Sequence, residues 1–273
     1  MVTRQDVCVA LQQLGVKNGD ICLFHSSFKS LGPVEGGAEA VIGGFEDCLG
    51  PEGTLVAPTL CSSDFFNSYV NWHLDKPSEV GYLPEYFRKL PGTLRSDQAT
   101  HSVAARGKLA HELTHEHAAY GHHLCPFGET AFADSSPWVK MYNRHAKVVF
   151  LGVTMRYNTF KHMIEGRYAE ELLAAVADLE IRQKLKAQLW TFENRWQGVW
   201  LFYDSVKMQL HLTRLGLVSE TTCGNATLYC VDAKAASDAA LEALRTCPED
   251  WYSGEALAWI NVCKAAAATD SDQ

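Results

Sequence analysis

The sequence has 273 residues, of which 47% are hydrophobic and 21% are charged, and this composition indicates an ordinary globular protein with enough apolar side chains for a core. Its formal net charge of −8 argues against nucleic-acid binding, because phosphates are bound by basic surfaces, and weakly favours cationic small-molecule substrates. There is no apolar run of bilayer length and no signal-peptide segment, so we expect a cytoplasmic protein without a membrane partner. The nine cysteines contain no CxxC pair and are expected to be reduced thiols, mostly in the core.

The first 60 residues predict alternating helices and strands. A helix opens at a capping box formed by Thr3 and Asp6. Residues 21–26 predict a buried strand that ends in polar residues, and a helix is expected over 38–50. A short turn then leads directly into a second strand, residues 54–60. This succession is typical of an α/β sheet.

Further elements are expected along the rest of the chain. Strands are predicted at 147–153 and 226–231. Helices are predicted at 83–90, 108–119, 158–174, 204–215 and 234–246. The aromatic-rich middle, 60–145, predicts long loops and helices over the edge of the sheet. We expect one domain over residues 1–264 and a frayed tail over 265–273.

The segment HELTHEHAAYGHH contains the H-E-x-x-H spacing of zinc peptidases. In such a site His111 and His115 would bind zinc from one helix face, and Glu112 would be the general base. A catalytic zinc also needs a third protein ligand. Two known patterns would place that ligand at Gly121 or Ser135, and neither side chain is suitable. We therefore favour a surface helix and no metal, with a zinc hydrolase as the alternative.

Two other segments carry residues suited to ligand binding and catalysis. The loop HSSFKSLGPVEGG, residues 25–37, leads toward a helix and would expose backbone N–H groups that suit a pyrophosphate, although a plain turn has the same pattern. In NTFKHMIE, residues 158–165, an N-cap at Asn158 would place Thr159 and His162 in one helical turn on the same face. A lone helical histidine is more often structural than catalytic, so the residues alone leave both readings open.

Three segments, taken together and in order, resemble the aminoglycoside 3-N-acetyltransferase family. They are residues 25–37, residues 92–107 (GTLRSDQATHSVAARG) and residues 127–165, which end in NTFKHMIE. The resemblance extends from Gly19 to about residue 244, and departs from many relatives at Gln98-Ala99, where they carry His-Pro. It implies a three-layer α/β fold with a mixed sheet, in which loop and helix insertions form the substrate cleft.

The resemblance also implies an activity, which is transfer of the acetyl group of acetyl-CoA to the 3-amino group of an aminoglycoside antibiotic. Acetylation of a different amine and a non-catalytic ligand-binding protein are the alternatives. Acetyl-CoA and an aminoglycoside or related amine are the expected partners, for a monomer or a homodimer. The family's helix pattern A…L…H matches Ala110, Leu113 and His117, so the HELTH segment would lie on an ordinary helix and no metal is implied.

Two of the segments imply the acetyl-CoA site. In the family the loop of the first segment holds acetyl-CoA, which implicates Ser27, Lys29, Ser30, Leu31 and Gly32. The second segment lines the channel for the pantetheine arm in relatives, which implicates Ser96, His101, Ser102 and Val103. These nine residues are the predicted cofactor-binding set.

The family pattern N-T-x-x-H-x-x-E is met without a departure and implies that His162 is the general base that takes a proton from the amine. Thr159 could donate to the developing oxyanion. Two carboxylates compete to orient His162. Because an (i, i+3) neighbour often points along the helix, we favour Glu193 over Glu165, and expect Glu165 to hold the substrate or the loop. We expect direct transfer in a ternary complex, without an acetyl-enzyme.

The substrate itself would be a polycationic sugar, which carboxylates and aromatic rings can bind. Asp64, Tyr69 and Trp72, in the loop after the second predicted strand, are the candidates for this wall of the cleft, together with Glu165. A solvated loop would have the same composition, and the sequence does not name the preferred antibiotic.

Overall fold

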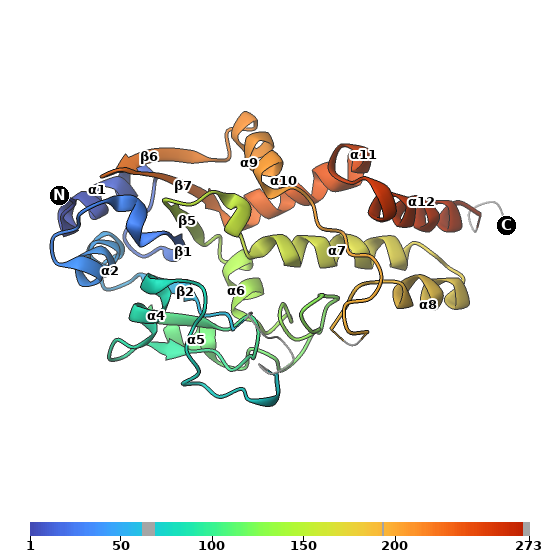
Figure 1. Cartoon of the computed structure of the whole chain (residues 1–273), viewed down its shortest axis with the longest axis horizontal. Coiled ribbons are helices and arrows are strands. Elements are labelled where there is room, and N and C mark those ends of the chain that lie inside the picture. Colours follow the sequence, from blue (N-terminus) through green and yellow to red (C-terminus); the bar gives the residue numbers. More distant parts are fainter. Residues whose placement is uncertain (62–68, 193, 270–273) are drawn as a thin grey trace.

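Figure 1 shows the computed structural model of the chain, which describes residues 1–61, 69–192 and 194–269. Within these residues the strands form a single sheet. They are β1 (Ile21–Ser26), β2 (Thr54–Pro58), β3 (Leu94–Arg95), β4 (Val103–Gly107), β5 (Lys147–Leu151), β6 (Ser219–Cys223) and β7 (Ala226–Asp232). Their order across the sheet is β3-β4-β2-β1-β5-β7-β6.

The centre of the sheet is parallel and its two sides are antiparallel. Strand β1 pairs in parallel with β2 and with β5, so that Leu23 lies opposite Val56 and Val148. Strands β4, β3, β7 and β6 are joined to this centre by antiparallel pairings. The carboxyl ends of β1, β2 and β5 therefore meet at the same edge of the sheet, which is where open α/β sheets bind ligands.

Side chains alternate between the two faces of the central strands, and a separate apolar core lies on each face. Phe24 and Cys22 belong to one core, and Leu23 and Ile21 to the other. The first core is covered by three helices, α1 (Arg4–Gln13), α2 (Gly37–Leu49) and α4 (Tyr82–Arg88). The second is covered by α5 (Ala110–Thr114), α6 (Pro137–Asn143), α7 (Phe160–Ala174), α9 (Ser205–Arg214), α10 (Ala233–Thr246) and α12 (Gly254–Thr269). The expected three-layer α/β fold with a mixed sheet is confirmed.

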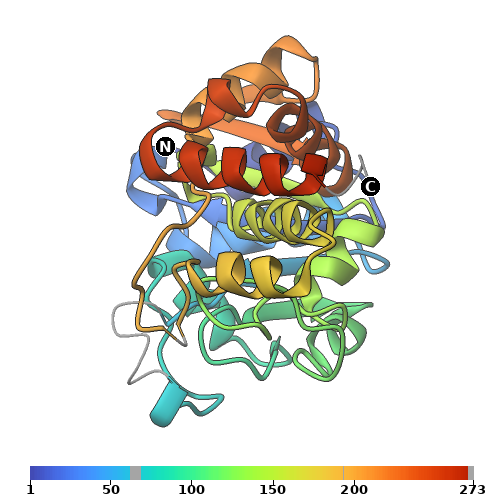
Figure 2. The ribbon, with the colours of Figure 1, turned by 90° about the vertical axis from the view of Figure 1, so that its right-hand side faces the viewer.

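The helices of the C-terminal half extend beyond the sheet. Figure 2 shows α12, α7 and α8 (Leu179–Ala187) stacked at this end of the molecule. The short helix α11 (Pro248–Trp251) connects α10 to α12. Trp259 of α12 is buried and donates a hydrogen bond from its indole nitrogen to the Leu185 carbonyl, 3.2 Å away. Helix α12 runs to Thr269 and so includes residues 265–269 of the expected tail.

Most elements expected from the sequence are present. The capping box at Thr3 and Asp6 forms, and the four expected strands appear as β1, β2, β5 and β7. The helix expected over 108–119 is shorter, because α5 ends at Thr114 and His115 has an extended backbone. Strands β3, β4 and β6 and helices α6, α8, α11 and α12 were not expected.

Two findings bear on the class of protein. All nine cysteines lie within the described residues and are free thiols, and all except Cys247 are buried, as expected from their scattered spacing. In the described ranges, no helix combines the length and the apolar character needed to cross a membrane.

Candidate active site

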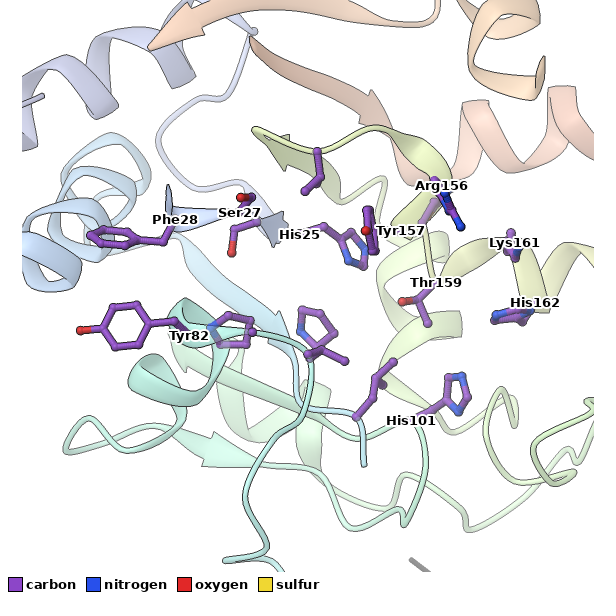
Figure 3. A pocket seen from close by; sticks show the side chains of 18 of the residues that line it. His25, Ser27, Phe28, Tyr82, His101, Arg156, Tyr157, Thr159, Lys161 and His162 are labelled. Atoms are coloured by element: carbon purple, nitrogen blue, oxygen red, sulfur yellow. The ribbon is translucent and has the colours of Figure 1, made fainter. Parts of the chain in front are cut away.

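A pocket of about 890 Å³ opens at the carboxyl edge of the parallel strands (Figure 3). Its walls come from the exits of β1 and β2, from the start of α4, and from the segment that connects β5 to α7 through the 3₁₀ turn Met155–Tyr157. The exits of β1 and β5 lie in close contact. A Cβ atom on Gly152, whose φ is +66°, would lie 2.5 Å from the Cβ of Ser30, so this position needs a glycine. The sheet topology therefore builds the pocket from segments that are far apart in the sequence.

The start of α7 places a histidine and a carboxylate side by side at one end of the pocket. The Asn158 side chain accepts a hydrogen bond from the Phe160 N–H at 3.2 Å, which leads the chain into the helix. His162 lines the pocket, and its Nδ1 lies 2.9 Å from Oε2 of Glu165. Glu165 is fully buried, and the indole nitrogen of Trp200 donates to the same Oε2 at 3.2 Å. Two neighbours thus hold one oxygen of this carboxylate.

Aromatic rings enclose His162 on several sides. The ring centroid of Phe127 lies 4.9 Å from that of His162, and Phe202 and His101 lie at 6.0 and 6.1 Å. Figure 3 shows His101, Thr159 and His162 around the same end of the pocket. Because Nδ1 faces Glu165, Nε2 is the ring nitrogen left for a ligand.

Two buried histidines on the pocket wall are neutral at physiological pH. Burial lowers the pKa of His25 to about 3, and its ring stacks on Phe150 with centroids 5.3 Å apart. Burial, reinforced by the charge of His162, holds the pKa of His101 well below its usual range. His25 was not among the predicted site residues, although a histidine at the exit of a buried strand was a usable signal. Its Nε2 has no hydrogen-bond partner among residues 1–61, 69–192 and 194–269, which suits a neutral polar group of a ligand.

The charged side chains of the pocket wall are all cationic. Lys29, Arg156 and Lys161 line the pocket, and no aspartate or glutamate does so in the part of the chain that the structure describes. A wall with this charge is suited to phosphate groups.

A comparison with known protein families decides where the chain belongs. The sequence profile of the family described as aminoglycoside 3-N-acetyltransferase matches residues 23–245, which is most of the chain. The chain belongs to the aminoglycoside 3-N-acetyltransferase family. The family expected from the three segments is confirmed.

Individual relatives share about 30% sequence identity with this chain. It is 31% identical over 196 residues to an aminoglycoside N(3)-acetyltransferase III from Salmonella sp., a match that covers 66% of this chain and 62% of the relative. It is 30% identical over 183 residues to an aminoglycoside N(3)-acetyltransferase IX from Micromonospora chalcea, over 60% of this chain and 62% of that protein. The chain thus spans about 62% of the length of these relatives.

Solved structures of the family share the fold. One neighbour, AAC-IIIb in a binary structure with CoASH, has a TM-score of 0.67 at 17% identity, over 92% of this chain and 98% of that one. The apoenzyme of aminoglycoside acetyltransferase AAC(3)-IVa has a TM-score of 0.65 at 20% identity, over 96% and 97%. At these identities the likeness concerns the fold.

The predicted acetyl-CoA residues of the family divide into two groups. Ser27, Lys29 and His101 line the pocket. Ser30, Leu31, Gly32, Ser96, Ser102 and Val103 do not, and of these Leu31, Ser96, Ser102 and Val103 are buried. Ser30 Oγ lies 2.8 Å from Ser27 Oγ and donates to the Gly152 carbonyl at 3.2 Å. It therefore links the segment that follows β1 to the segment that follows β5. Direct contact of this second group with acetyl-CoA stays a prediction.

The second segment of the family pattern, residues 92–107, forms buried hydrogen bonds next to the pocket. Ser96 Oγ accepts the Val103 N–H at 2.9 Å and lies 2.8 Å from Nδ1 of the buried His117. Ser102 Oγ donates to the Thr59 carbonyl at 3.0 Å. These bonds fix the segment that carries His101 in place.

The structure changes the choice between the two carboxylates. The preference for Glu193 rests on the expectation that an (i, i+3) carboxylate points along the helix. That reason is wrong here, since Glu165 points at the ring of His162 and contacts it. Glu193 lies outside the described residues.

Two of the predicted substrate residues, Tyr69 and Trp72, do not line the pocket. Asp64 is outside the described residues. Tyr69 donates from its hydroxyl to the Phe127 carbonyl at 2.7 Å, so it touches the residue that packs on His162. Trp72 donates to Asp97 at 2.6 Å, and the Arg95 guanidinium lies 4.7 Å from its ring centroid. Trp72 is thus engaged in packing, and its contact with a substrate stays a prediction.

The HELTH segment forms part of the surface. The rings of His111 and His115 stack with centroids 5.0 Å apart, and Glu112 forms an ion pair with Arg144. His117, the histidine of the family helix pattern, is buried against Ser96. Across the described ranges, there is no group of three histidine, cysteine or acidic residues arranged to hold a metal ion.

Proposed function

We propose that this protein is an enzyme that transfers the acetyl group of acetyl-CoA to the 3-amino group of an aminoglycoside. Membership of the aminoglycoside 3-N-acetyltransferase family supports the reaction. A structural neighbour described with CoASH, and another described in complex with apramycin, support the two ligand classes. The observation that carries the proposal is the pair formed by His162 and the buried Glu165 at the pocket wall.

The pocket fits acetyl-CoA in charge and in polarity. Lys29, Arg156 and Lys161 would hold its phosphate groups, because they are the charged side chains on the described wall. The apolar residues Pro58 and Leu60 at the β2 exit would flank the pantetheine arm. When bound, acetyl-CoA would supply an acetyl thioester, whose C–S bond breaks after the new C–N bond forms, and the CoA thiolate that leaves would take up the proton that His162 accepts from the amine.

In the proposed mechanism His162 moves the proton. An ammonium group has no lone pair, so Nε2 of His162 would take a proton from the amine before or during attack. Glu165 would stabilise the imidazolium that results and keep the ring in its orientation. Thr159, which lines the pocket one turn before His162 and forms no side-chain cap, would donate its hydroxyl to the developing oxyanion.

Direct transfer in a ternary complex is the form of the reaction that we propose. An acetyl-enzyme would need a nucleophile beside the base. No cysteine lines the described wall of the pocket, and the Ser27 hydroxyl is engaged with Ser30.

A second candidate is acetylation of an amine other than an aminoglycoside. One observation favours it. The described pocket wall carries no carboxylate, whereas a polycationic sugar is bound best by several. The proposed contacts of Asp64, Tyr69 and Trp72 with a polycationic sugar apply only to the first candidate, which is the acetylation of an aminoglycoside.

A thiol-release assay tests both candidates. The purified protein is mixed with acetyl-CoA and a panel of aminoglycosides, and in parallel with simple primary amines and an aminoglycoside lacking the 3-amino group. We expect release of CoA with aminoglycosides that carry this group, and NMR spectra of the product should place the acetyl group on N3. Turnover only with the other amines would select the second candidate, and no turnover with any amine would contradict both.

A further inference from the structure

Behind the His162–Glu165 pair lies a group of buried tyrosines that the proposed mechanism does not use. Tyr168, Tyr203 and Tyr252 are 2%, 4% and 5% exposed. Tyr168 lies on α7, Tyr203 immediately precedes the N-cap residue of α9, and Tyr252 follows α11. Three distant parts of the chain thus bring phenol groups into the core that contains the start of α7.

Packing places Tyr252 against Tyr168, which lies one helical turn after Glu165 on α7. The ring of Tyr252 stacks on that of Tyr168 with centroids 6.1 Å apart and an interplanar angle of 10°. Tyr168 is three residues after Glu165 on α7, so the two share a helix face. Trp200, which donates to Glu165, and Tyr203 reach the same region from one short segment.

Several buried polar atoms in this region lack a hydrogen-bond partner in the described structure. They are Oε1 of Glu165 and the hydroxyls of Tyr168 and Tyr252. A carboxylate oxygen can only accept and a phenol can donate, so these groups are complementary. A buried carboxylate oxygen without a donor is costly, which makes a hydrogen bond at this position favourable.

The charge of Glu165 acts on two of these buried tyrosines. Burial and the charge of Glu165 raise the pKa of Tyr203 and of Tyr252 well above the usual range, so both hydroxyls keep their protons at neutral pH. Burial raises the pKa of Tyr168 to about 12, with smaller effects from Glu171, Glu249 and Cys263. Other titratable groups of the described residues near the pair include His101, whose ring lies 6.1 Å from that of His162, and Lys161, which lines the pocket beside it.

We infer that Tyr252 is a positioning residue, whose hydroxyl donates to Oε1 of Glu165 through one ordered water, with Tyr168 and Tyr203 beside it. A buried polar site with several partners is where proteins hold such waters. With Trp200 and His162 on Oε2 and Tyr252 on Oε1, both oxygens of Glu165 are held. The importance of this bond for catalysis rests on the proposed function, whereas its effect on the titration of His162 does not.

The direction in which the Tyr252 hydroxyl should change the apparent pKa measured at His162 follows from charge. His162 and Glu165 are in hydrogen-bond contact, so proton binding at one depends on the charge of the other. A donor on Oε1 stabilises the pair most in its negative form, with His162 neutral and Glu165 ionised. Removing the donor destabilises this form relative to the form with one more proton, so the apparent pKa of the pair rises.

NMR titration of the His162 ring tests the inference in protein without substrates. We expect Tyr252→Phe, which keeps the stacked ring, to raise the apparent pKa by about one unit, the size expected for one hydrogen bond to a charged group. If acetyl transfer is observed, the acidic limb of the kcat/KM profile should move in the same direction while KM for acetyl-CoA stays unchanged. Tyr120→Phe, which removes an exposed hydroxyl, is the matched control and should change neither value.

A double-mutant cycle separates this role from a purely structural one. In a Glu165→Gln background, Tyr252→Phe should no longer shift the His162 titration, because the charge that it acts on is gone. An unchanged His162 pKa in Tyr252→Phe, or an equal shift in the Glu165→Gln background, would overturn the inference. A high-resolution crystal structure of the unchanged protein is a second test that does not depend on the variant, and the absence of an ordered water between the Tyr252 hydroxyl and Oε1 of Glu165 would also overturn the inference. Absence of acetyl transfer would contradict the proposed function alone.

Discussion

Glu165 accepts a hydrogen bond at 2.9 Å from Nδ1 of His162, one helical turn earlier on α7. A carboxylate can only accept, so this contact places the proton of the neutral imidazole on Nδ1. The lone pair is then on Nε2, the nitrogen that a general base at the pocket wall needs. The geometry therefore determines the tautomer before any ligand binds.

Replacing His162 should separate catalysis from acetyl-CoA binding. We expect His162→Ala to lose about 10²- to 10⁴-fold in kcat, the usual contribution of a general base. Calorimetry should still detect acetyl-CoA binding, because Lys29 and Arg156 are unchanged. The exposed His111 provides a matched control, and His111→Ala should retain activity. Near-normal kcat in folded His162→Ala would rule out its proposed role.

The two candidate carboxylates can be compared directly. Glu165→Gln should lower kcat about 10²-fold or more, because an amide can donate to Nδ1 and favour the wrong tautomer of His162. Glu193→Gln should have the smaller effect. Both variants are to be compared by steady-state kinetics and thermal unfolding. A large loss in Glu193→Gln with little change in Glu165→Gln would instead support Glu193 as the carboxylate that orients His162.

Intact-protein mass spectrometry can detect an acetyl-enzyme. After mixing with acetyl-CoA alone, we expect no stable mass gain of one acetyl group, since no cysteine lines the described pocket wall. The same sample should form acetylated product when an amine is added. A stoichiometric adduct that disappears on addition of the amine would replace direct transfer with a two-step mechanism.

Stability should fall in acid because three histidines are buried without charge. Burial lowers the pKa of His25 to about 3 and that of His117 to about 4, and holds that of His101 well below its usual range. Below about pH 6.5 the unfolded chain binds protons that the folded chain does not, so each such histidine costs up to about 1.4 kcal/mol of unfolding free energy per pH unit. Unfolding in urea at pH 7 and pH 5 measures this loss.

The charge of His123 should stabilise the folded protein at neutral pH, and this stabilisation should be lost at high pH. Its contact with Glu170, together with that of Asp134, raises its pKa to about 9. Its contribution is therefore full below about pH 6.5 and is lost as the pH rises through about 9. Thermal unfolding of His123→Gln against the unchanged protein should show a difference at pH 7 that shrinks by pH 10. A constant difference would mean that the charge of His123 is not involved.

Zinc content tests the alternative reading of the HELTH segment. Elemental analysis of the purified protein should find no stoichiometric zinc, because His111 and His115 have no third ligand at a workable spacing. Treatment with a chelator should leave thiol release unchanged. About one zinc per chain, with activity lost on chelation, would favour a metalloenzyme.

Local sequence patterns were sufficient for the elements whose signals lie within a few residues. The capping box of Thr3 and Asp6, and the apolar strands at the centre of the sheet, depend on neighbours in the chain. The short edge strand β3 and the polar strand β6 carry little periodicity, because an edge strand is held mainly by its partner. Helix α12 was not expected from the sequence either, because its stability comes from packing on α7 and α8.

The sequence by itself determined the family and singled out His162, because the N-T-x-x-H-x-x-E pattern is contained within residues 158–165. Only the tertiary structure showed that Glu165 contacts that histidine. Trp200, 35 residues after Glu165 in the chain, donates to the same carboxylate oxygen that holds His162. The tertiary structure likewise brought His25 to the pocket wall, through the parallel pairing of β1 with β5. Burial and pairing between distant segments set these contacts, and no spacing within a single segment encodes them.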